Sequence, residues 1–406
     1  MFVILLASIV LFFLSIFSHP VRNFFHSAYF FILLAYTWYI TILLFWGEHK
    51  QETFPQYEGE KIAVLIPYFN EDPRLLLDSI RSVHEARGNK EIFIVDDGST
   101  SGIDSDHIKK VCEAIGAEIH FFEANQGKRH ALHHAVKNMI KDHKFVVTID
   151  SDTILDRDAL IRVVEPLKAQ SVGASTGDVR LLNENENFLT RMVGAYYWVG
   201  LQIFKKAQSN LGIVVCCSGC LAAYRSDILL KIIDEFVQQR FLGEACTHSE
   251  DRHLTNLVLR DGYQVKYTDA AISYTRTPSR LSSFLKQQQR WKRGFIREST
   301  YTLAYAWRVK PVLFFQIILC ELTIPFFAFG LMIALIVSLI VYPELFIHSV
   351  LPSWIVFMFV RYIHVFFYGR KKIPGLLLYM FFYEILLYWQ FIYALFTVRN
   401  KSWITR

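Results

Sequence analysis

Three acidic pairs are the residues of this sequence whose types and spacing are best suited to chemistry. They are Asp96-Asp97, Asp150-Ser151-Asp152 and Glu250-Asp251. In the second pair the two carboxylates are two residues apart at the end of an apolar run, so they can share a divalent cation. Such a cation needs further oxygens, and a diphosphate can supply them. The pair therefore indicates a site for a cation that neutralises a departing nucleoside diphosphate, although acidic turns after strands are common.

A second carboxylate and a basic cluster extend this site. Asp97 can accept hydrogen bonds from a uracil or a ribose, or the run 96–99 is only a turn in which Gly98 supplies a positive φ. Lys128, within the run 125–129, places a cation where phosphates would lie, or else begins a solvated basic helix. Taken together, in this order and at the ends of expected strands, these residues indicate a nucleotide-sugar site.

Glu250 and Asp251 precede an apolar helical stretch, residues 254–260. In one interpretation their carboxylates cap the N-terminus of this helix, where they suit the helix dipole. In the other, Asp251 is a general base that takes a proton from a sugar hydroxyl. The two interpretations are compatible, because a helix N-terminus holds a carboxylate rigidly.

Gln287, Arg290 and Trp291 form an aromatic and cationic cluster just before the long apolar segments. Trp291 could be an interfacial anchor beside a membrane. Its partners favour a second role, in which the flat indole stacks on a sugar ring and Arg290 pairs with a diphosphate. These residues therefore indicate an acceptor-binding platform.

The elements expected to position these residues alternate along the chain. Apolar runs at 61–67, 91–95, 117–122 and 145–149 predict strands, and helical patterns lie at 73–86, 104–115 and 128–141. This alternation predicts an α/β unit with a mostly parallel sheet and helices on both faces. Ligands of such sheets bind at the carboxyl ends of the strands, where the aspartates fall.

The composition predicts a chain that is partly embedded in a membrane. Of the 406 residues, 53% are hydrophobic and 20% are charged. Five nearly uncharged segments match a hydrocarbon core in length; they are 2–18, 24–46, most of 311–342, 349–368 and 375–397. We expect residues 1–47 to be a retained helix pair rather than a signal peptide, because no basic n-region is present. Residues 48–300 are expected to form the α/β domain, facing the cytosol between the membrane segments.

The charge and the cysteines of the chain limit which binding partners and metals are expected. The net charge is +6, with basic clusters at 286–297 and 369–372 beside apolar segments, which is typical of cytoplasmic bias and contact with lipid head groups. No basic stripe indicates nucleic acid. Six cysteines fit a reduced domain, and Cys217 with Cys220 is a lone CxxC that does not predict zinc. Glu384 makes a simple span over 375–397 costly, so we favour an interfacial segment followed by a cytosolic tail.

This combination resembles the processive membrane family-2 glycosyltransferases, the group of hyaluronan, chitin and cellulose synthases. The resemblance extends from about residue 60 to 406 and is closest to hyaluronan synthases. It is carried by the runs Asn125 to His130, Phe241-Leu242-Gly243, Asp251 to Asn256, Gln287 to Trp291 with Arg297-Glu298-Ser299, and Trp403-Ile404-Thr405-Arg406, which is similar to a W-G-T-R gating motif.

The resemblance implies a cytosolic GT-A domain and a role for each matching residue. Asp97 would contact the uridine, Lys128 the diphosphate and Asp150 the nucleotide, while Asp152 would hold Mg²⁺ or Mn²⁺. Asp251 would be the base of an inverting transfer. The remaining residues would bind the acceptor, the diphosphate or the donor; they are Gly219, Gln287, Arg290, Trp291, Trp403 and Arg406.

The resemblance also implies a multi-pass protein of the plasma membrane that polymerises UDP-sugars and passes the polysaccharide through its own helices. Residues 301–397 would be interfacial and transmembrane helices forming the channel, with Glu321, Arg361 and Glu384 as candidate lining residues or, for the last two, interfacial ones. Residues 398–406 would be a gating tail. UDP-GlcNAc and UDP-GlcA would be the donors for a hyaluronan-type product.

Departures from the hyaluronan synthase pattern keep alternatives open. Ser249-Glu250-Asp251-Arg252 stands where those enzymes usually read G-D-D-R, and Ser218-Gly219-Cys220 where they read S-G-P. The runs 215–220 and 250–251 look closer to nodulation-type chitooligosaccharide synthases, which need only UDP-GlcNAc. A non-processive transferase acting on a lipid-linked sugar is a second alternative, and a transporter with a vestigial nucleotide domain is a third.

Overall fold

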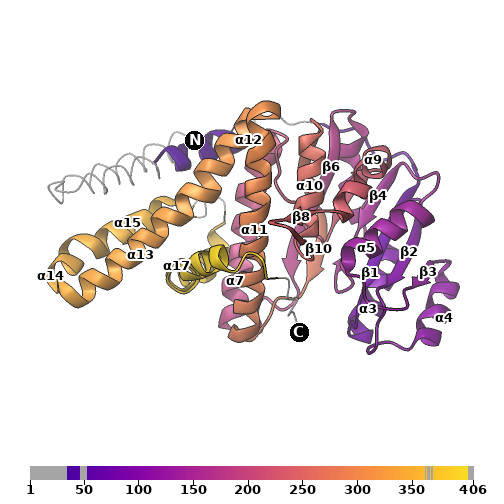
Figure 1. Cartoon of the computed structure of the whole chain (residues 1–406), viewed down its shortest axis with the longest axis horizontal. Helices are drawn as coiled ribbons and strands as arrows, with labels where there is room; N and C mark the ends of the chain where they lie inside the picture. The colour runs from indigo at the N-terminus through magenta and orange to yellow at the C-terminus, as the bar shows by residue number, and fades with distance from the viewer. Residues whose placement is uncertain (1–33, 46–52, 362, 364–365, 367–368, 401–406) are drawn as a thin grey trace. The chain divides into compact units, whose positions relative to one another are not determined.

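The computed structural model describes residues 34–45, 53–361, 363, 366 and 369–400 of the chain (Figure 1). The chain divides into two compact units. We call the first the sheet unit; it comprises Glu52–Glu184, Gln208–Pro278 and Arg399–Arg406. The second, the helical unit, comprises Met1–Gln51, Asn185–Ala207 and Ser279–Val398. Each unit is therefore built from segments that are far apart in the sequence.

An eight-stranded sheet forms the centre of the sheet unit, in the order β3-β2-β1-β4-β7-β6-β10-β5. Its strands are β1 (Ile62–Tyr68), β2 (Lys90–Asp96), β3 (Glu118–Phe121), β4 (Phe145–Thr148), β5 (Ile154–Leu155), β6 (Val172–Leu181), β7 (Ala222–Arg225) and β10 (Gln264–Thr275). The pairs β1–β2, β1–β4, β2–β3 and β6–β10 are parallel, whereas β7 is antiparallel to both neighbours and β5 to β10. The predicted α/β unit with a mostly parallel sheet is confirmed.

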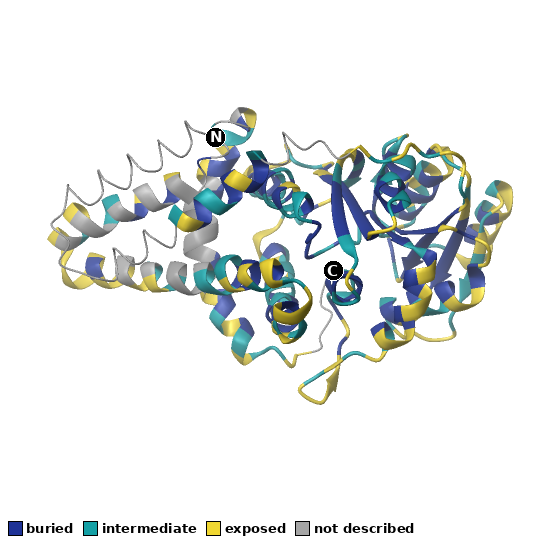
Figure 2. Ribbon diagram, turned by 90° about the horizontal axis from the view of Figure 1, so that it is seen from above, coloured by how far each residue is buried: buried dark blue, intermediate teal, exposed yellow. Residues whose placement is uncertain are grey.

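The strands form where the sequence is apolar without interruption. All seven residues of β1 are buried, as are the last five of β2, because helices cover both faces of a parallel sheet. In Figure 2 the central strands of the sheet are coloured mostly as buried, while the helices around them also carry exposed residues. Alternate residues of β1, β2 and β4 belong to one core cluster on one face of the sheet, and the residues between them are buried as well. Strands β2 and β4 lead directly to the acidic residues.

The helices of the sheet unit are α3 (Pro73–Glu85), α4 (Ser105–Ile115), α5 (Lys128–His134), α6 (Ala159–Val164), α9 (Ser226–Val237) and α10 (Glu250–Arg260). Among them, α3 and α4 begin at aspartates whose side chains cap them. Asp72 caps α3 by accepting from the backbone N–H groups of Arg74 and Leu75. The helix predicted over 128–141 differs, because α5 ends at His134 and continues as a π-helical turn, η1 (Ala135–Met139).

The helical unit consists of long helices joined by π-helical turns. Its main elements are α7 (Phe188–Trp198), η3 (Val199–Lys205), α11 (Leu281–Val309), α12 (Pro311–Gln316), η4 (Ile317–Thr323), α13 (Ile324–Val341), α15 (Leu351–Arg361) and α17 (Ile373–Phe396). Both α7 and α11 pack against α17. Helices α7 and α17 approach each other closely at Gly375. A side chain there would not fit, because its Cβ atom would lie only 2.8 Å from the carbonyl oxygen of Arg191.

The expected membrane segments have only a partial counterpart in the described residues. Helices α13, α15 and α17 lie where apolar segments were predicted. Over the part of the chain that the structure describes, no helix combines the length and the apolar character of a membrane span. Residues 2–18, 24–33 and 46 lie outside the described residues, as do the gating-tail residues Trp403 and Arg406 and the side chains of Arg361 and Glu384.

Candidate active site

Lys128 joins two of the acidic pairs in the sheet unit. Its Nζ lies 2.5 Å from Oδ1 of Asp150 and 2.9 Å from Oε1 of Glu250. Lys128 is the first residue of α5, Asp150 follows β4, and Glu250 begins α10. The ammonium group therefore links a strand end to two helix starts that are far apart in the sequence.

The electrostatics of this triad follow from its burial. Burial alone would lower the pKa of Lys128, but the carboxylates of Asp150 and Glu250 outweigh it and raise that pKa well above its ordinary value. Burial opposes ionisation of Glu250 as well, yet Lys128 and a backbone hydrogen bond lower the pKa of Glu250 to about 2. Lys128 and Glu250 are therefore held as an ion pair at neutral pH.

Asp150 is positioned by its backbone and by a glycine that faces it. The Asp150 N–H donates to the carbonyl of Gly219 at 3.0 Å, and the Thr153 N–H donates to the Asp150 carbonyl at 3.0 Å. A Cβ on Gly219 would lie 2.9 Å from Oδ2 of Asp150 and 3.1 Å from Nζ of Lys128. Gly219, which the resemblance assigns to binding, therefore lies directly against the charged pair, where a larger residue would meet Asp150 and Lys128.

Asp251 lies one residue into α10, which begins at a strained position. Ser249, the N-cap, has φ +60° and makes no side-chain capping bond. The Sγ of Cys216 donates to Oδ2 of Asp251 at 3.4 Å, and the Arg252 N–H donates to Oδ1 at 2.7 Å. Burial, and next the charge of Glu250, raise the pKa of Asp251. A partly exposed carboxylate with a raised pKa is suited to accept a proton near neutral pH.

Asp97 is buried, and its carboxylate holds the loop that precedes α5. It is 3% exposed, and its carboxylate accepts from the N–H groups of Gln126 (2.8 Å) and Gly127 (2.8 Å) and from Nδ2 of Asn125 (3.0 Å). Burial raises its pKa against the lowering effect of these backbone bonds. Asp97 therefore fixes the loop that leads into Lys128, and this structural contribution does not test its predicted contact with a uridine.

Asp152 and its surroundings are compatible with a divalent cation. The pKa of the Cys220 thiol is raised by burial and then by the charges of both Asp150 and Asp152, so the two carboxylates lie near the same thiol. Within the described ranges, no three His, Cys, Asp or Glu side chains are grouped so as to hold a metal ion. Mg²⁺ is commonly held by one or two carboxylates together with substrate phosphates, and that donor set fits these residues.

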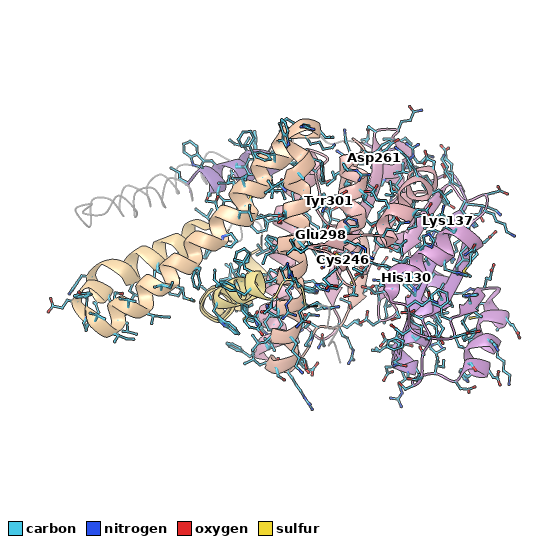
Figure 3. The ribbon with its side chains drawn as sticks, in the orientation of Figure 1. His130, Lys137, Cys246, Asp261, Glu298 and Tyr301 are labelled. Atoms are coloured by element: carbon cyan, nitrogen blue, oxygen red, sulfur yellow. The ribbon has the colours of Figure 1, made fainter. Side chains whose placement is uncertain are left out.

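Sequence reasoning missed three contacts of this site. Glu250 was assigned no role beyond capping, Cys216 none at the base, and Glu71 was not singled out, although its carboxylate accepts from the hydroxyl of Ser151 at 2.8 Å. Arg129, expected beside phosphates, is instead 3% exposed and donates to the carbonyl of Phe236 at 3.0 Å. His130 follows it along α5 (Figure 3). Each of these roles becomes visible only from the residue that the side chain contacts, and that residue is distant in the sequence.

The second group of predicted residues lies in the helical unit, on α11. Gln287, Arg290 and Trp291 have the spacing of one helix face and are all partly exposed. Trp291 lies next to Tyr197 of α7, with ring centroids 6.4 Å apart. Further along α11 lie Glu298 and Tyr301 (Figure 3), and the carboxylate of Glu321, the expected lining residue, accepts from the hydroxyl of Ser299 at 2.6 Å.

Comparisons with known proteins indicate the family of the chain and its fold. A family model described as "Glycosyltransferase like family 2" matches residues 59–294. An N-acetylglucosaminyltransferase of Azorhizobium caulinodans is 32% identical over 263 residues, which cover 63% of this chain and 65% of that protein. One of Mesorhizobium japonicum is 34% identical over 244 residues, covering 59% and 56%. The chain thus matches less than two thirds of the length of these relatives.

A solved structure shows the same fold. It is a mannosyltransferase from Pyrobaculum calidifontis in complex with GDP-Man and Mn²⁺, with a TM-score of 0.60 over 92% of this chain and 96% of that one. The two sequences are 16% identical, so the likeness concerns the fold alone. It is the GT-A-like fold that the sequence predicts.

Proposed function

The chain belongs to the glycosyltransferase-like family 2, and on that premise we propose that it transfers N-acetylglucosamine from UDP-GlcNAc to a growing β-linked sugar chain. The observation that carries the proposal is Lys128, which holds the acidic strand end at Asp150 and the helix start at Glu250 together through contacts of 2.5 and 2.9 Å. Asp251, the proposed base, is adjacent to that helix start. The relatives named above support GlcNAc as the sugar, since both are N-acetylglucosaminyltransferases.

In the proposed reaction Asp251 accepts the proton of an acceptor hydroxyl. The hydroxyl oxygen then forms a bond to the anomeric carbon of the donor as the bond from that carbon to the UDP oxygen breaks. The UDP leaves with the electron pair, and the configuration changes from α to β in one displacement. The raised pKa of Asp251 suits a base that must hold the transferred proton. The Cys216 thiol, which donates to Oδ2, orients the carboxylate.

The diphosphate would lie between Lys128 and Asp152. Lys128 would exchange part of its contact with Asp150 for a phosphate oxygen, which is a favourable partner for an ammonium group. A bound Mg²⁺ or Mn²⁺, held by Asp152 with Asp150 on the nucleotide side, would neutralise charge on the departing diphosphate. The mannosyltransferase with the same fold was solved with Mn²⁺, which supports this assignment.

We further propose that the reaction is processive and takes place at the plasma membrane. The helical unit would bind the nascent chain through Gln287, Arg290 and Trp291, and Trp403 with Arg406 would close over the donor. The apolar segments and the flanking basic clusters at 286–297 and 369–372 support membrane insertion with the sheet unit in the cytosol.

A hyaluronan-type activity is the second candidate. It is favoured by the run Asp251 to Asn256 and by Gln287 to Trp291 with Arg297-Glu298-Ser299, which resemble hyaluronan synthases most. The run Cys216-Cys217-Ser218 and the pair Glu250-Asp251 favour the chitooligosaccharide type instead. Because the relatives named above agree with the latter, we place UDP-GlcNAc alone first.

The deciding experiment uses the full chain purified in detergent or reconstituted in vesicles. It is incubated with Mg²⁺ or Mn²⁺ and with UDP-GlcNAc alone, UDP-GlcA alone, or both, and the products are sized and digested. GlcNAc oligomers from UDP-GlcNAc alone support the first candidate, and polymer formed only with both donors supports the second. A single sugar added to a lipid refutes processivity, and no consumption of any UDP-sugar refutes the whole proposal. The Asp251→Asn variant is the matched control.

A further inference from the structure

We propose that Tyr197 is a second acceptor-binding residue, which forms with Trp291 a two-ring platform for the nascent sugar chain. This inference rests on the proposed function and extends it to a residue outside the acceptor motif of α11. The ring centroids of Tyr197 and Trp291 lie 6.4 Å apart and their planes meet at 49°. The two rings come from α7 and α11, and both are only partly buried.

The neighbouring tyrosine shows what a purely structural ring does in the same helix. Tyr196 stacks on Tyr379 of α17, with centroids 5.1 Å apart and planes at 14°, and Tyr379 is 4% exposed. That pair fastens α7 to α17. The two tyrosines also contact each other edge to face, with centroids 6.1 Å apart, but their partners outside α7 differ: Tyr196 packs on Tyr379, whereas Tyr197 lies beside the proposed acceptor residue Trp291.

The backbone of α7 is held firmly enough to present Tyr197 in one place. Two glycines pack closely against α7. A Cβ atom on Gly369 would lie 2.4 Å from a ring carbon of Trp198, and one on Gly375 would lie 3.2 Å from Cβ of Ala195. At its start α7 has a capping box, in which Asn187 and Thr190 bond reciprocally. A ring held in this way loses little freedom when a ligand binds, so more of the contact energy is expressed as affinity.

The chemistry of two angled rings suits a polymer of sugars. Each pyranose has an apolar face of C–H groups that stacks on an aromatic ring, and such stacking does not depend on which hydroxyls are modified. In a β-linked chain, successive units turn alternate faces outward, so two rings at an angle can contact two units at once. Tyr197 would therefore affect how long the enzyme retains its product, more than how fast one transfer occurs.

The test compares Tyr197→Ala and Tyr197→Phe in the full chain. The measurements are the KM for added chitotetraose, the KM for UDP-GlcNAc and the length distribution of the products. We expect Tyr197→Ala to raise the chitotetraose KM about tenfold, which corresponds to about 1.4 kcal/mol. It should also shorten the products and leave the donor KM unchanged. Tyr197→Phe, which keeps the ring, should restore both values.

Tyr196→Leu is the matched control. We expect it to lower the melting temperature through the lost stack on Tyr379 without changing product length. The inference is overturned if Tyr197→Ala retains wild-type lengths and acceptor KM, if Tyr197→Phe is as impaired as Tyr197→Ala, or if Tyr196→Leu shortens the products equally. A wild-type protein that consumes no UDP-GlcNAc would instead refute the proposed function itself.

Discussion

Both units contain buried polar atoms without a hydrogen-bond partner among the described residues, such as Oγ of Ser79 and Ser226 in the sheet unit, but the polar side chains in and beside the predicted site differ between the units. In the sheet unit these side chains have protein partners: Lys128 contacts two carboxylates, and Asp97 accepts from three residues. In the helical unit, on and beside α11, both amide atoms of Gln289 and the Oε1 of Gln390 are buried and have no hydrogen-bond partner among the described residues.

This contrast indicates that the polar residues of the two units are present for different reasons. A buried amide atom without a partner costs roughly 1–3 kcal/mol, so Gln289 and Gln390 are not explained by stability. The ion pairs of Lys128, in contrast, contribute to the fold of the sheet unit as well as to its chemistry. Under the proposed function, the reaction therefore uses a network of ion pairs that is already assembled in the sheet unit.

The largest effect that tests this division is expected from Asp251→Asn. Without the base, transfer should fall by roughly 10²–10⁴-fold, while UDP binding changes little, because the proposed role of that carboxylate is toward the acceptor hydroxyl and not toward UDP. Transfer is measured as UDP release and binding by calorimetry. Polymerisation that persists in this variant would refute the base assignment and with it the location of the chemistry in the sheet unit.

Paired substitutions to Met compare the two units directly. Lys128→Met leaves Asp150 and Glu250 as neighbouring carboxylates without their cation, and should lower the free energy of unfolding by about 2 kcal/mol. Gln289→Met removes two amide atoms that have no described partner, and should leave that free energy within about 0.5 kcal/mol or raise it. Denaturant titration of both variants measures the difference. Equal losses would show that the helical unit depends on its amides as much as the sheet unit does on its ion pairs.

The pH profile of Glu250→Gln tests whether the assembled network sets the properties of the base. After burial, the charge of Glu250 is the next cause that raises the pKa of Asp251. Below that pKa Asp251 is protonated and cannot accept a proton, so kcat/KM rises with pH. Removing the negative charge lowers the pKa of Asp251, so the acidic limb of the kcat/KM profile should move to lower pH.

Glu235→Gln is the control for this shift. Its carboxylate is also paired, with Arg260 at 2.8 Å, but it does not contact the residues of the site. The pH profile of this variant should match the wild type. A limb that stays in place in Glu250→Gln, or moves to higher pH, would contradict the electrostatic link between the two carboxylates.

The first half of the sheet could be predicted because its strands are uninterrupted apolar runs. Residues 61–67 and 91–95 were expected as strands, and β1 and β2 occupy them within a residue. Strand β6 gave no such signal, because Ser175, Thr176 and Asp178 are buried within it. Thr176 donates to the carbonyl of Leu221 and Asp178 accepts from Tyr267, so these polar residues are satisfied only by partners that the fold brings together.

The site shows the same limit. The type of each acidic turn was visible in the sequence, since an aspartate after an apolar run is a local pattern. The partner of Lys128 at Glu250 and the thiol of Cys216 at Asp251 were not visible, because each contact joins elements far apart in the chain. Tyr197 was not recognised either, since a tyrosine on an apolar helix carries no signal until its neighbour is known.

The smallest expected effect concerns backbone strain, which also separates the units. Among the described residues, the non-glycine residues with positive φ are Asn70, Leu242 and Ser249, and all three lie in the sheet unit. Ser249 has φ +60° and no side-chain capping bond, so glycine would adopt this conformation without losing a contact. Ser249→Gly should therefore raise the free energy of unfolding by about 0.5–1 kcal/mol.

Asn70→Gly provides the matched comparison, because Asn70 has φ +49° but its Oδ1 accepts from the N–H groups of Thr100 (2.8 Å) and Ser101 (3.0 Å). Relief of strain is offset there by two lost bonds, so this variant should be about 1 kcal/mol less stable than wild type. Thermal unfolding of both variants gives the two values. If Ser249→Gly is stabilised and also loses transfer activity, the strain serves to hold Asp251 in place; if it is destabilised, the serine makes a contribution other than its backbone conformation, and the network of the sheet unit extends to it.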